Sequence, residues 1–136
     1  MNLSTEMKKK LVDTAIHARK WAYAPYSRYK VGAALLTTSG KIYDGVNVEN
    51  VDYTDGICAE RTAVFKAVSE GELQFSAIAV VSSNGGSLCG SCRQVLAEFG
   101  LNIDVLIADS AGNILEETTV ADLLPGAFTP TDLKPE

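Results

Sequence analysis

Histidine and cysteine are scarce in this sequence: its 136 residues include one histidine, His17, and three cysteines. Three cysteines cannot all pair within one chain, and a reducing compartment would keep the thiols available as metal ligands. His17 falls near Lys10 and Asp13 on the polar side of a predicted helix, which favours a solvated histidine over a metal ligand. The cysteines are therefore the residues that best indicate a metal site.

Long apolar runs and a strong positive charge are also absent. Residues 1–6 contain no apolar core of signal-peptide length, and no stretch approaches the roughly 20 residues of a membrane span. The net charge is −5, and the lysines at 8–10 form a local run typical of a solvated helix face. The glycines at 85–86 lack the following Lys-Ser/Thr of a phosphate loop. We expect a soluble cytoplasmic protein that binds neither membranes nor nucleic acid.

The composition that is present is typical of a globular protein, with 46% hydrophobic and 21% charged residues. The length suits one hydrophobic core, and no linker-like segment divides the chain. We expect a single domain over residues 1–136, with residues 129–136 as a polar C-terminal tail.

Hydrophobic periodicity predicts alternating helices and strands. Residues 4–22 are expected to form an amphipathic helix, ending before Pro25, whose apolar arc contains Met7, Leu11, Ala15, Ala18, Trp21 and Ala22. Strands are expected at 31–37, 41–46, 76–81, 103–108 and 113–116, and further helices at 58–70, 89–99 and 119–124. This order predicts an α/β, three-layer α/β/α fold around a mixed five-stranded sheet.

All three cysteines fall within 35 residues, as Cys58 and the CxxC pair Cys89 and Cys92. A CxxC turn aims both sulfurs at one point, so the three thiols predict a site for one soft divalent metal, with zinc favoured. Three ligands leave one position for water, whose pKa zinc lowers from about 15.7 toward about 7. Glu60, two residues after the first ligand, is the predicted catalytic group that handles its protons.

Both cysteine segments are predicted at helix N-termini, since Cys58 opens the helix 58–70 and Cys89 opens the helix 89–99. Unpaired backbone N–H groups and the positive end of the helix dipole favour thiolates and carboxylates there. The alternative interpretation of Glu60 is a first-turn glutamate that only improves the interaction with the dipole.

The segments 58–61 (Cys-Ala-Glu-Arg) and 89–95 (Cys-Gly-Ser-Cys-Arg-Gln-Val) resemble those of the small, three-cysteine, homotetrameric cytidine deaminases. The resemblance extends over further blocks at 24–27, 31–34, 47–50 and 123–128. It implies a cytidine-deaminase-like fold with one zinc per subunit. It also implies hydrolysis of cytidine and 2′-deoxycytidine to the uridines with release of ammonia, a reaction of pyrimidine salvage.

The resemblance implies substrate-binding roles for four residues. Asn47 and Glu49 are expected to hydrogen-bond a ribose hydroxyl, Tyr29 to lie against the base, and the backbone around Ala59 to meet the pyrimidine. From the residues alone, Asn47 and Glu49 would be ordinary loop side chains and Tyr29 would be core packing.

Four further residues are assigned by the same resemblance or remain open. Tyr53 and Phe128 are expected to act across a subunit interface of a homotetramer and close a neighbour's pocket. Three thiolates leave a divalent cation with a net charge of −1, and Arg61 is implied to offset this by hydrogen-bonding ligand sulfurs. Arg93 has either a similar role or only a surface salt bridge.

The sequence departs from the family pattern near the pocket, with Leu88 in place of proline, Tyr29 in place of phenylalanine, and Val51-Asp52 in place of two small residues. Without the fixed φ of proline, the loop before Cys89 is expected to be looser. Tolerance of N4-substituted cytidines is the resulting hypothesis.

Other functions remain open at this stage. The segment 54–56 also resembles blasticidin-S deaminases, which suggests a modified nucleoside as substrate. A zinc-stabilised binding module would leave Glu60 dispensable. A redox dithiol of Cys89 and Cys92 is disfavoured because Cys58 and Glu60 would then have no role.

Overall fold

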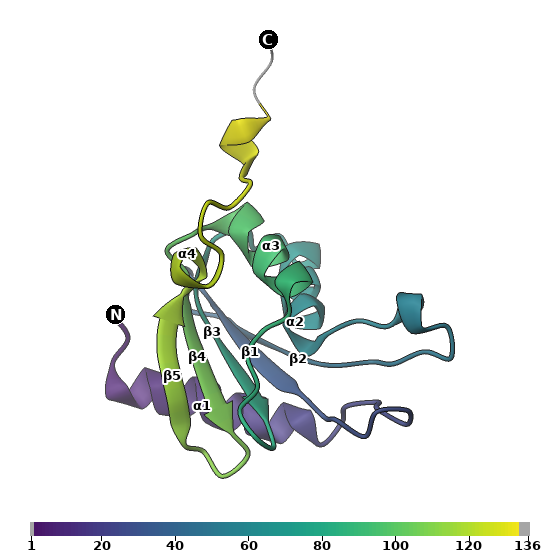
Figure 1. The fold of residues 1–136 in the computed structure, drawn as a ribbon. Helices are drawn as coiled ribbons and strands as arrows, with labels where there is room; N and C mark the ends of the chain where they lie inside the picture. Colours follow the sequence, from purple (N-terminus) through teal and green to yellow (C-terminus); the bar gives the residue numbers. More distant parts are fainter. Residues whose placement is uncertain (1, 134–136) are drawn as a thin grey trace.

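The computed structural model describes residues 2–133 and contains one mixed sheet with the strand order β2-β1-β3-β4-β5 (Figure 1). The strands are β1 (Gly32–Thr37), β2 (Ile42–Val46), β3 (Phe75–Ser82), β4 (Asp104–Asp109) and β5 (Ile114–Thr119). Only the β3–β4 pair is parallel among these neighbours. The expected hairpin is formed by β1 and β2.

The helices cover both faces of the sheet. They are α1 (Thr5–Arg19), α2 (Ala59–Ser69), α3 (Gly90–Phe99) and α4 (Val120–Leu123), with two short 3₁₀ turns, η1 (Tyr53–Asp55) and η2 (Pro130–Asp132). Figure 1 shows α1 across one face and α2 and α3 on the other, so the predicted three-layer α/β/α fold is confirmed. Within residues 2–133 no helix has the length and apolar character needed to cross a membrane.

Two hydrophobic clusters hold the layers together, because successive side chains of a strand point to opposite faces. Leu35 and Ile78 point toward α2 and α3, where they join a cluster with Val64 and Leu96. The other face is lined mainly by small side chains and packs against α1 through Leu11, Ala15, Ala34, Ala77, Ala79 and Leu106. Truncating a fully buried leucine of this kind to alanine costs about 2 to 5 kcal/mol.

Glycines in β1 and β2 let the helices approach the backbone of the sheet. A Cβ atom at Gly45 would lie 2.5 Å from both the Ala59 carbonyl oxygen and the Ala63 nitrogen, and one at Gly32 would lie 2.1 Å from the Ala15 carbonyl oxygen. Contacts this short exclude a side chain at either glycine in the present arrangement. The first turn of α2 is therefore set directly on β2, which fixes the position of the residues that open this helix.

The structure differs from the predicted elements at two places. The first helix ends at Arg19 rather than near residue 22, and Trp21 is 75% exposed rather than part of the buried arc. Lys20 caps the helix, and the chain turns there so that Ala22, which the arc included, is buried beyond the end of the helix, together with Ala24. The last strand is also longer than the predicted 113–116, because pairing with β4 defines β5 while most of its side chains face solvent.

The C-terminal segment extends away from the body of the domain beyond α4 (Figure 1). Of the polar tail expected at 129–136, Pro130–Asp132 form η2, and residues 134–136 lie outside the described part of the chain.

Candidate active site and metal centre

The N-termini of α2 and α3 bring the three cysteines together. Cys58 is the N-cap of α2 and Cys89 is the N-cap of α3, where its Sγ accepts a hydrogen bond from the Cys92 backbone N–H at 3.5 Å. The three Sγ atoms all lie within 4.8 Å of one another. The geometry confirms the prediction from the sequence that these thiols converge. We call this region, together with Glu60, the sulfur end of the site.

The sulfur positions fit zinc. Three sulfurs bound to one tetrahedral zinc at about 2.3 Å would be about 3.8 Å apart, and Cys58 Sγ and Cys89 Sγ are separated by 3.7 Å. His17 is exposed and its Nδ1 is paired with the Asp13 carbonyl group, so it contributes no fourth ligand. The donor set is therefore three thiols, which leaves a fourth tetrahedral position free of protein ligands among residues 2–133.

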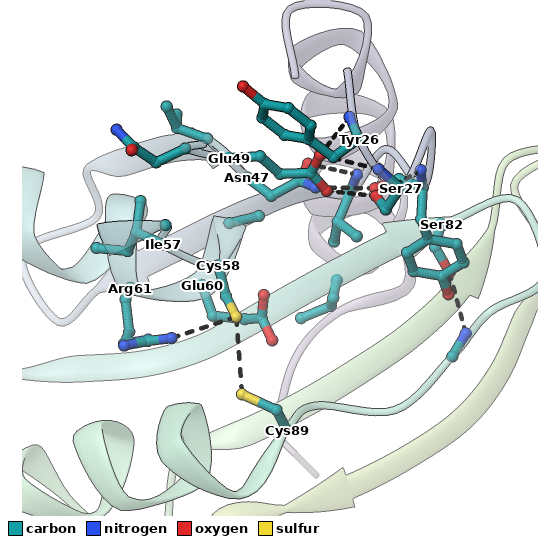
Figure 2. Close-up of a pocket in the computed structure, with 18 of the residues that line it drawn as sticks. Tyr26, Ser27, Asn47, Glu49, Ile57, Cys58, Glu60, Arg61, Ser82 and Cys89 are labelled. Atoms are coloured by element: carbon teal, nitrogen blue, oxygen red, sulfur yellow. Dashed lines mark hydrogen bonds between the residues drawn. The ribbon is translucent and has the colours of Figure 1, made fainter. Parts of the chain in front are cut away.

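Arg61 stands next to the sulfur cluster, one turn along α2 from Cys58. Its Nη2 donates a hydrogen bond to Cys58 Sγ at 3.4 Å (Figure 2). Hydrogen bonding by Cys92 and then by Arg61 lowers the pKa of Cys58 to about 5, and the bond to Cys58 in turn raises the pKa of Arg61. The guanidinium group therefore favours the thiolate form that a metal requires.

Glu60 is buried at the sulfur end, with 4% of its surface exposed. Figure 2 shows its carboxylate beside the Cys58 sulfur. Burial, reinforced by the nearby Cys58 charge, raises the pKa of Glu60, so the carboxyl group holds a proton more readily than a free glutamate does. Such a group suits proton transfer near neutral pH.

A cavity of about 670 Å³ extends from the sulfurs to the loops between secondary-structure elements. Of the residues assigned a role from the sequence, nine line it: Tyr29, Asn47, Glu49, Tyr53, Cys58, Ala59, Glu60, Arg61 and Cys89. Cys92, which is fully buried behind the wall, and Phe128, which is 55% exposed elsewhere, do not. The fold thus builds one cavity from separate segments of sequence that lie between residues 26 and 89.

Asn47 and Glu49 lie at the other end of the cavity, the loop end, formed by the segments 26–31 and 47–57. Asn47 accepts a hydrogen bond from the Val31 N–H at 2.9 Å and donates one to the Tyr29 carbonyl oxygen at 2.8 Å. Asn47 therefore fixes the backbone on either side of residue 30, and its expected contact with ribose stays a prediction.

The Glu49 carboxylate binds the same loop at Tyr26 and Ser27. It accepts hydrogen bonds from the backbone N–H groups of Tyr26 and Ser27 at 3.0 and 3.1 Å and from the Ser27 hydroxyl group (Figure 2). The hydrogen bonds from Ser27 lower the pKa of Glu49, so the carboxyl group stays ionised at a lower pH than a free glutamate does. The sequence did not identify Tyr26 and Ser27 as partners of Glu49, because these hydrogen bonds join residues more than twenty positions apart.

Tyr53 and Phe128 are both exposed apolar side chains in this single chain. Tyr53 is 79% exposed, lines the chain's own cavity and packs edge-on against Tyr26 with the ring centroids 5.9 Å apart. Phe128 lies on the C-terminal segment, whose backbone is held by a hydrogen bond from Gln94 Nε2 to the Phe128 carbonyl oxygen at 2.8 Å. Their expected action on a neighbouring subunit stays a prediction.

Within residues 2–133 Arg93 forms no salt bridge, and its guanidinium group bonds the backbone instead of a surface carboxylate. Its Nε donates to the Leu88 carbonyl oxygen at 2.9 Å, and its Nη1 donates to the Leu123 carbonyl oxygen at 2.7 Å. Leu88 itself is 3% exposed. The loop before Cys89 thus has a buried anchor where the loss of proline suggested looseness, because tertiary contacts replace the fixed φ angle.

Comparison with known proteins agrees with this geometry. The profile of the family described as the cytidine and deoxycytidylate deaminase zinc-binding region matches residues 5–108. The chain is 53% identical over 128 residues to a cytidine deaminase of Sporosarcina psychrophila, covering 92% of this chain and 93% of that protein. It is 49% identical over 126 residues to one of Halalkalibacterium halodurans, covering 90% and 95%.

A solved structure gives the same result for the fold. The crystal structure of cytidine deaminase from Burkholderia pseudomallei superposes with a TM-score of 0.84 at 44% sequence identity, covering 93% of this chain and all of that one.

Proposed function

The chain belongs to the zinc-dependent cytidine and deoxycytidylate deaminase family, and we propose that it hydrolyses cytidine and 2′-deoxycytidine to uridine and 2′-deoxyuridine with release of ammonia. The observation that carries the proposal is one cavity lined by a buried carboxylate, Glu60, beside a cluster of three thiols that fits zinc. A redox dithiol or a purely structural zinc site would not require a buried carboxylate on the same cavity.

We assign the metal to Cys58, Cys89 and Cys92, and proton transfer to Glu60. Zinc held by the three sulfurs supplies a Lewis acid that brings the pKa of a water molecule down toward about 7. Glu60 accepts one proton of the attacking water and delivers it to N3 of the pyrimidine ring, and it then takes the second proton from the hydroxyl group now on C4 and gives it to the departing amine. The water oxygen adds to C4, the bond from C4 to the exocyclic nitrogen breaks, and ammonia leaves.

Arg61 and the loop end complete the assignment. The guanidinium group of Arg61 offsets the net −1 charge that three thiolates leave on a divalent cation. Ribose would lie at the loop end against Asn47 and Glu49, with the base beside Tyr29 and the backbone of Ala59. Figure 2 shows Asn47 and Glu49 at one end of the cavity and the sulfurs of Cys58 and Cys89 at the other, which supports this orientation.

The charges of the lining favour a nucleoside over a nucleotide. Arg61 is the single lysine or arginine among the described lining residues, and it already donates to Cys58 Sγ. Glu49 and Glu60 add two carboxyl groups to the same cavity. A 5′-phosphate would find negative charge and no free cation, which costs binding energy that an uncharged 5′-hydroxyl group does not lose.

A homotetramer in the cytoplasm is the proposed working form. Tyr53 and Phe128 are large apolar side chains exposed by 79% and 55%, and a neighbouring subunit would cover them while completing the pocket. Three free thiols at a metal site are consistent with a reducing compartment. Mass measurement in solution tests the assembly, and a monomer that retains full activity would contradict it.

The substrate is tested by following the ultraviolet absorbance of cytidine, 2′-deoxycytidine and 2′-deoxycytidine 5′-monophosphate after addition of the zinc-loaded protein. Turnover of both nucleosides, with the nucleotide hydrolysed at least about tenfold less efficiently, is the expected result. Equal use of the monophosphate would overturn the argument from charge. No turnover of any of the three would favour a zinc-stabilised binding module.

A further inference from the structure

The hydroxyl group of Tyr29 makes contacts that the proposed reaction does not use. Its oxygen lies 2.7 Å from Asn84 Oδ1 and 2.9 Å from Ser82 Oγ. Ser82 is the last residue of β3 and is 2% exposed, and its Oγ accepts a hydrogen bond from the Gly86 backbone N–H at 3.0 Å. The segment before β1 is thereby tied to the segment between β3 and α3, here called the 83–88 loop.

Three oxygens meet at this contact, because Ser82 Oγ also lies 3.3 Å from Asn84 Oδ1. The Asn84 amide oxygen can only accept, so it takes the hydrogens that the two hydroxyl groups offer. Ser82 Oγ in turn accepts from the Gly86 N–H. The Tyr29 hydroxyl group therefore belongs to a network that ends on Asn84 and Gly86, both of which lie on the 83–88 loop.

The loop backbone also touches the phenol directly. A Cβ atom at Gly86 would lie 2.5 Å from the Tyr29 oxygen, so the two groups are in contact only because residue 86 has no side chain. At its other end the loop is held by Arg93, which bonds the Leu88 carbonyl oxygen. Arg93 Nη2 also donates to Ser87 Oγ at 3.1 Å. The loop is thus held by Tyr29 at its Asn84 and Gly86 side and by Arg93 at its end, and Gly86 and Ser87 line the cavity.

We infer that the Tyr29 hydroxyl group is a positioning group that holds the 83–88 loop as the cavity wall beside the three sulfurs and so limits the size of the substituent on the leaving amine. This inference rests on the proposed function, in which the amine departs at the sulfur end. With N4-methylcytidine, water adds to C4, the bond from C4 to nitrogen breaks, and methylamine leaves with the proton from Glu60. The methyl group must then fit against Gly86 and Ser87.

The kinetic test compares cytidine with N4-methylcytidine in the parent, Tyr29→Phe, Ser82→Ala and the double variant. Tyr29→Phe keeps the ring against the base and removes only the hydroxyl group. We expect the ratio of kcat/KM for N4-methylcytidine over cytidine to rise by about threefold to tenfold, the effect of about one hydrogen bond. Ser82→Ala should shift the ratio in the same direction, and the double variant should exceed neither single variant by much.

The matched control is Tyr23→Phe, which removes a hydroxyl group from a tyrosine that is 55% exposed and outside the cavity lining. Its substrate ratio should equal that of the parent. An unchanged ratio in Tyr29→Phe, or fully additive effects of Tyr29→Phe and Ser82→Ala, would overturn the inference. Equal hydrolysis of both nucleosides by the parent would overturn the size limit.

A second measurement does not depend on turnover. The Gly86 amide hydrogen is protected by its bond to Ser82 Oγ, so hydrogen exchange at Gly86 should be several-fold faster in Tyr29→Phe and unchanged in Tyr23→Phe. If the parent fails to deaminate cytidine, the proposed function falls while this exchange still tests the positioning. Identical Gly86 exchange in the parent and Tyr29→Phe would overturn the inference whatever the activity.

Discussion

At the sulfur end of the cavity the functional groups lie on the first turns of two helices, whereas at the loop end they lie on the connecting segments 26–31 and 47–57. Glu60 is 4% exposed and Cys92 is fully buried, but Tyr53 is 79% exposed. Bond-breaking needs groups held in fixed geometry on rigid elements, and recognition tolerates groups on adaptable loops. The two ends should therefore respond differently to substitution, with effects on kcat at the sulfur end and on KM at the loop end.

The largest expected effect comes from Cys92→Ser, which removes a buried sulfur from the metal site. Zinc content should fall well below one ion per chain, and kcat/KM for cytidine should fall by more than about 10⁴-fold, because water with a pKa near 15.7 is not ionised at neutral pH. Metal analysis and the absorbance assay measure both, with circular dichroism to verify folding. Ser91→Ala in the same turn is the control. A folded Cys92→Ser variant with full zinc and activity would remove Cys92 from the ligand set.

Glu60→Gln should have the next largest effect and separates chemistry from metal binding. The amide cannot move protons, so kcat should fall by about 10² to 10⁴-fold while zinc is retained. Glu98→Gln on the exposed side of α3 is the matched control and should behave as the parent. Parent-like kcat in Glu60→Gln would leave the buried carboxyl group without a role in proton transfer.

Arg61→Lys keeps the charge and loses the planar guanidinium group that bonds Cys58 Sγ at 3.4 Å. Losses of about 10 to 100-fold in zinc affinity or kcat are expected, as for other groups that orient metal ligands. Competition with a zinc chelator measures the affinity. Arg28→Lys, an exposed arginine outside the cavity lining, is the control, and an equal loss in both variants would point to a general effect of the substitution.

Glu49→Gln should give the smallest effect of the four and should act on KM. We expect KM for cytidine to rise by about tenfold with kcat changed by less than about threefold, because a charged acceptor is lost at the loop end. Steady-state kinetics measure this, with the exposed Glu116→Gln as the control. If Glu49→Gln lowered kcat as much as Glu60→Gln does, the proposed division into kcat effects at the sulfur end and KM effects at the loop end would be wrong.

The pH dependence of the parent's KM adds a second check on Glu49. Its pKa is lowered from 4.5, mainly by the Ser27 hydroxyl group, so the ionised form is present above this lowered value and is lost as the pH falls through it. The contribution of Glu49 to KM should therefore be constant from neutral pH down to about 5. A contribution that is lost near neutral pH, measured as the difference between parent and Glu49→Gln, would contradict the charged role.

The same contrast explains which parts of the site the sequence predicted. Cys58 and Glu60 share the start of one helix and Cys89 and Cys92 share the start of another, so local spacing predicted each pair, and the metal chemistry of three thiols predicted that the two pairs meet. The order of strands and helices likewise predicted the three layers. The bonds of Glu49 to the backbone at Tyr26 and Ser27 depend on the folded path of a distant loop, which no local pattern encodes.

Arg93 and Trp21 are two further residues whose surroundings the local sequence did not predict. Arg93 bonds the carbonyl group of Leu123, thirty residues away, so its partners could not be inferred from its neighbours in sequence. Trp21 fits the apolar arc of a helix that continues to residue 22, but the helix stops at Arg19 and the side chain points to solvent. Periodicity gives the face of an element and not its last residue.

The first turn of α2 packs directly against the backbone at Gly45, and this contact limits how the scaffold can be engineered. Any attempt to retune the enzyme by changing β2 at that position would displace the metal-bearing helix before it changed the choice of nucleoside. New specificities are better sought in the segments 26–31 and 47–57 at the loop end of the cavity, which lie outside the first turns of α2 and α3. The scaffold thus separates a part to be preserved from a part that is open to redesign.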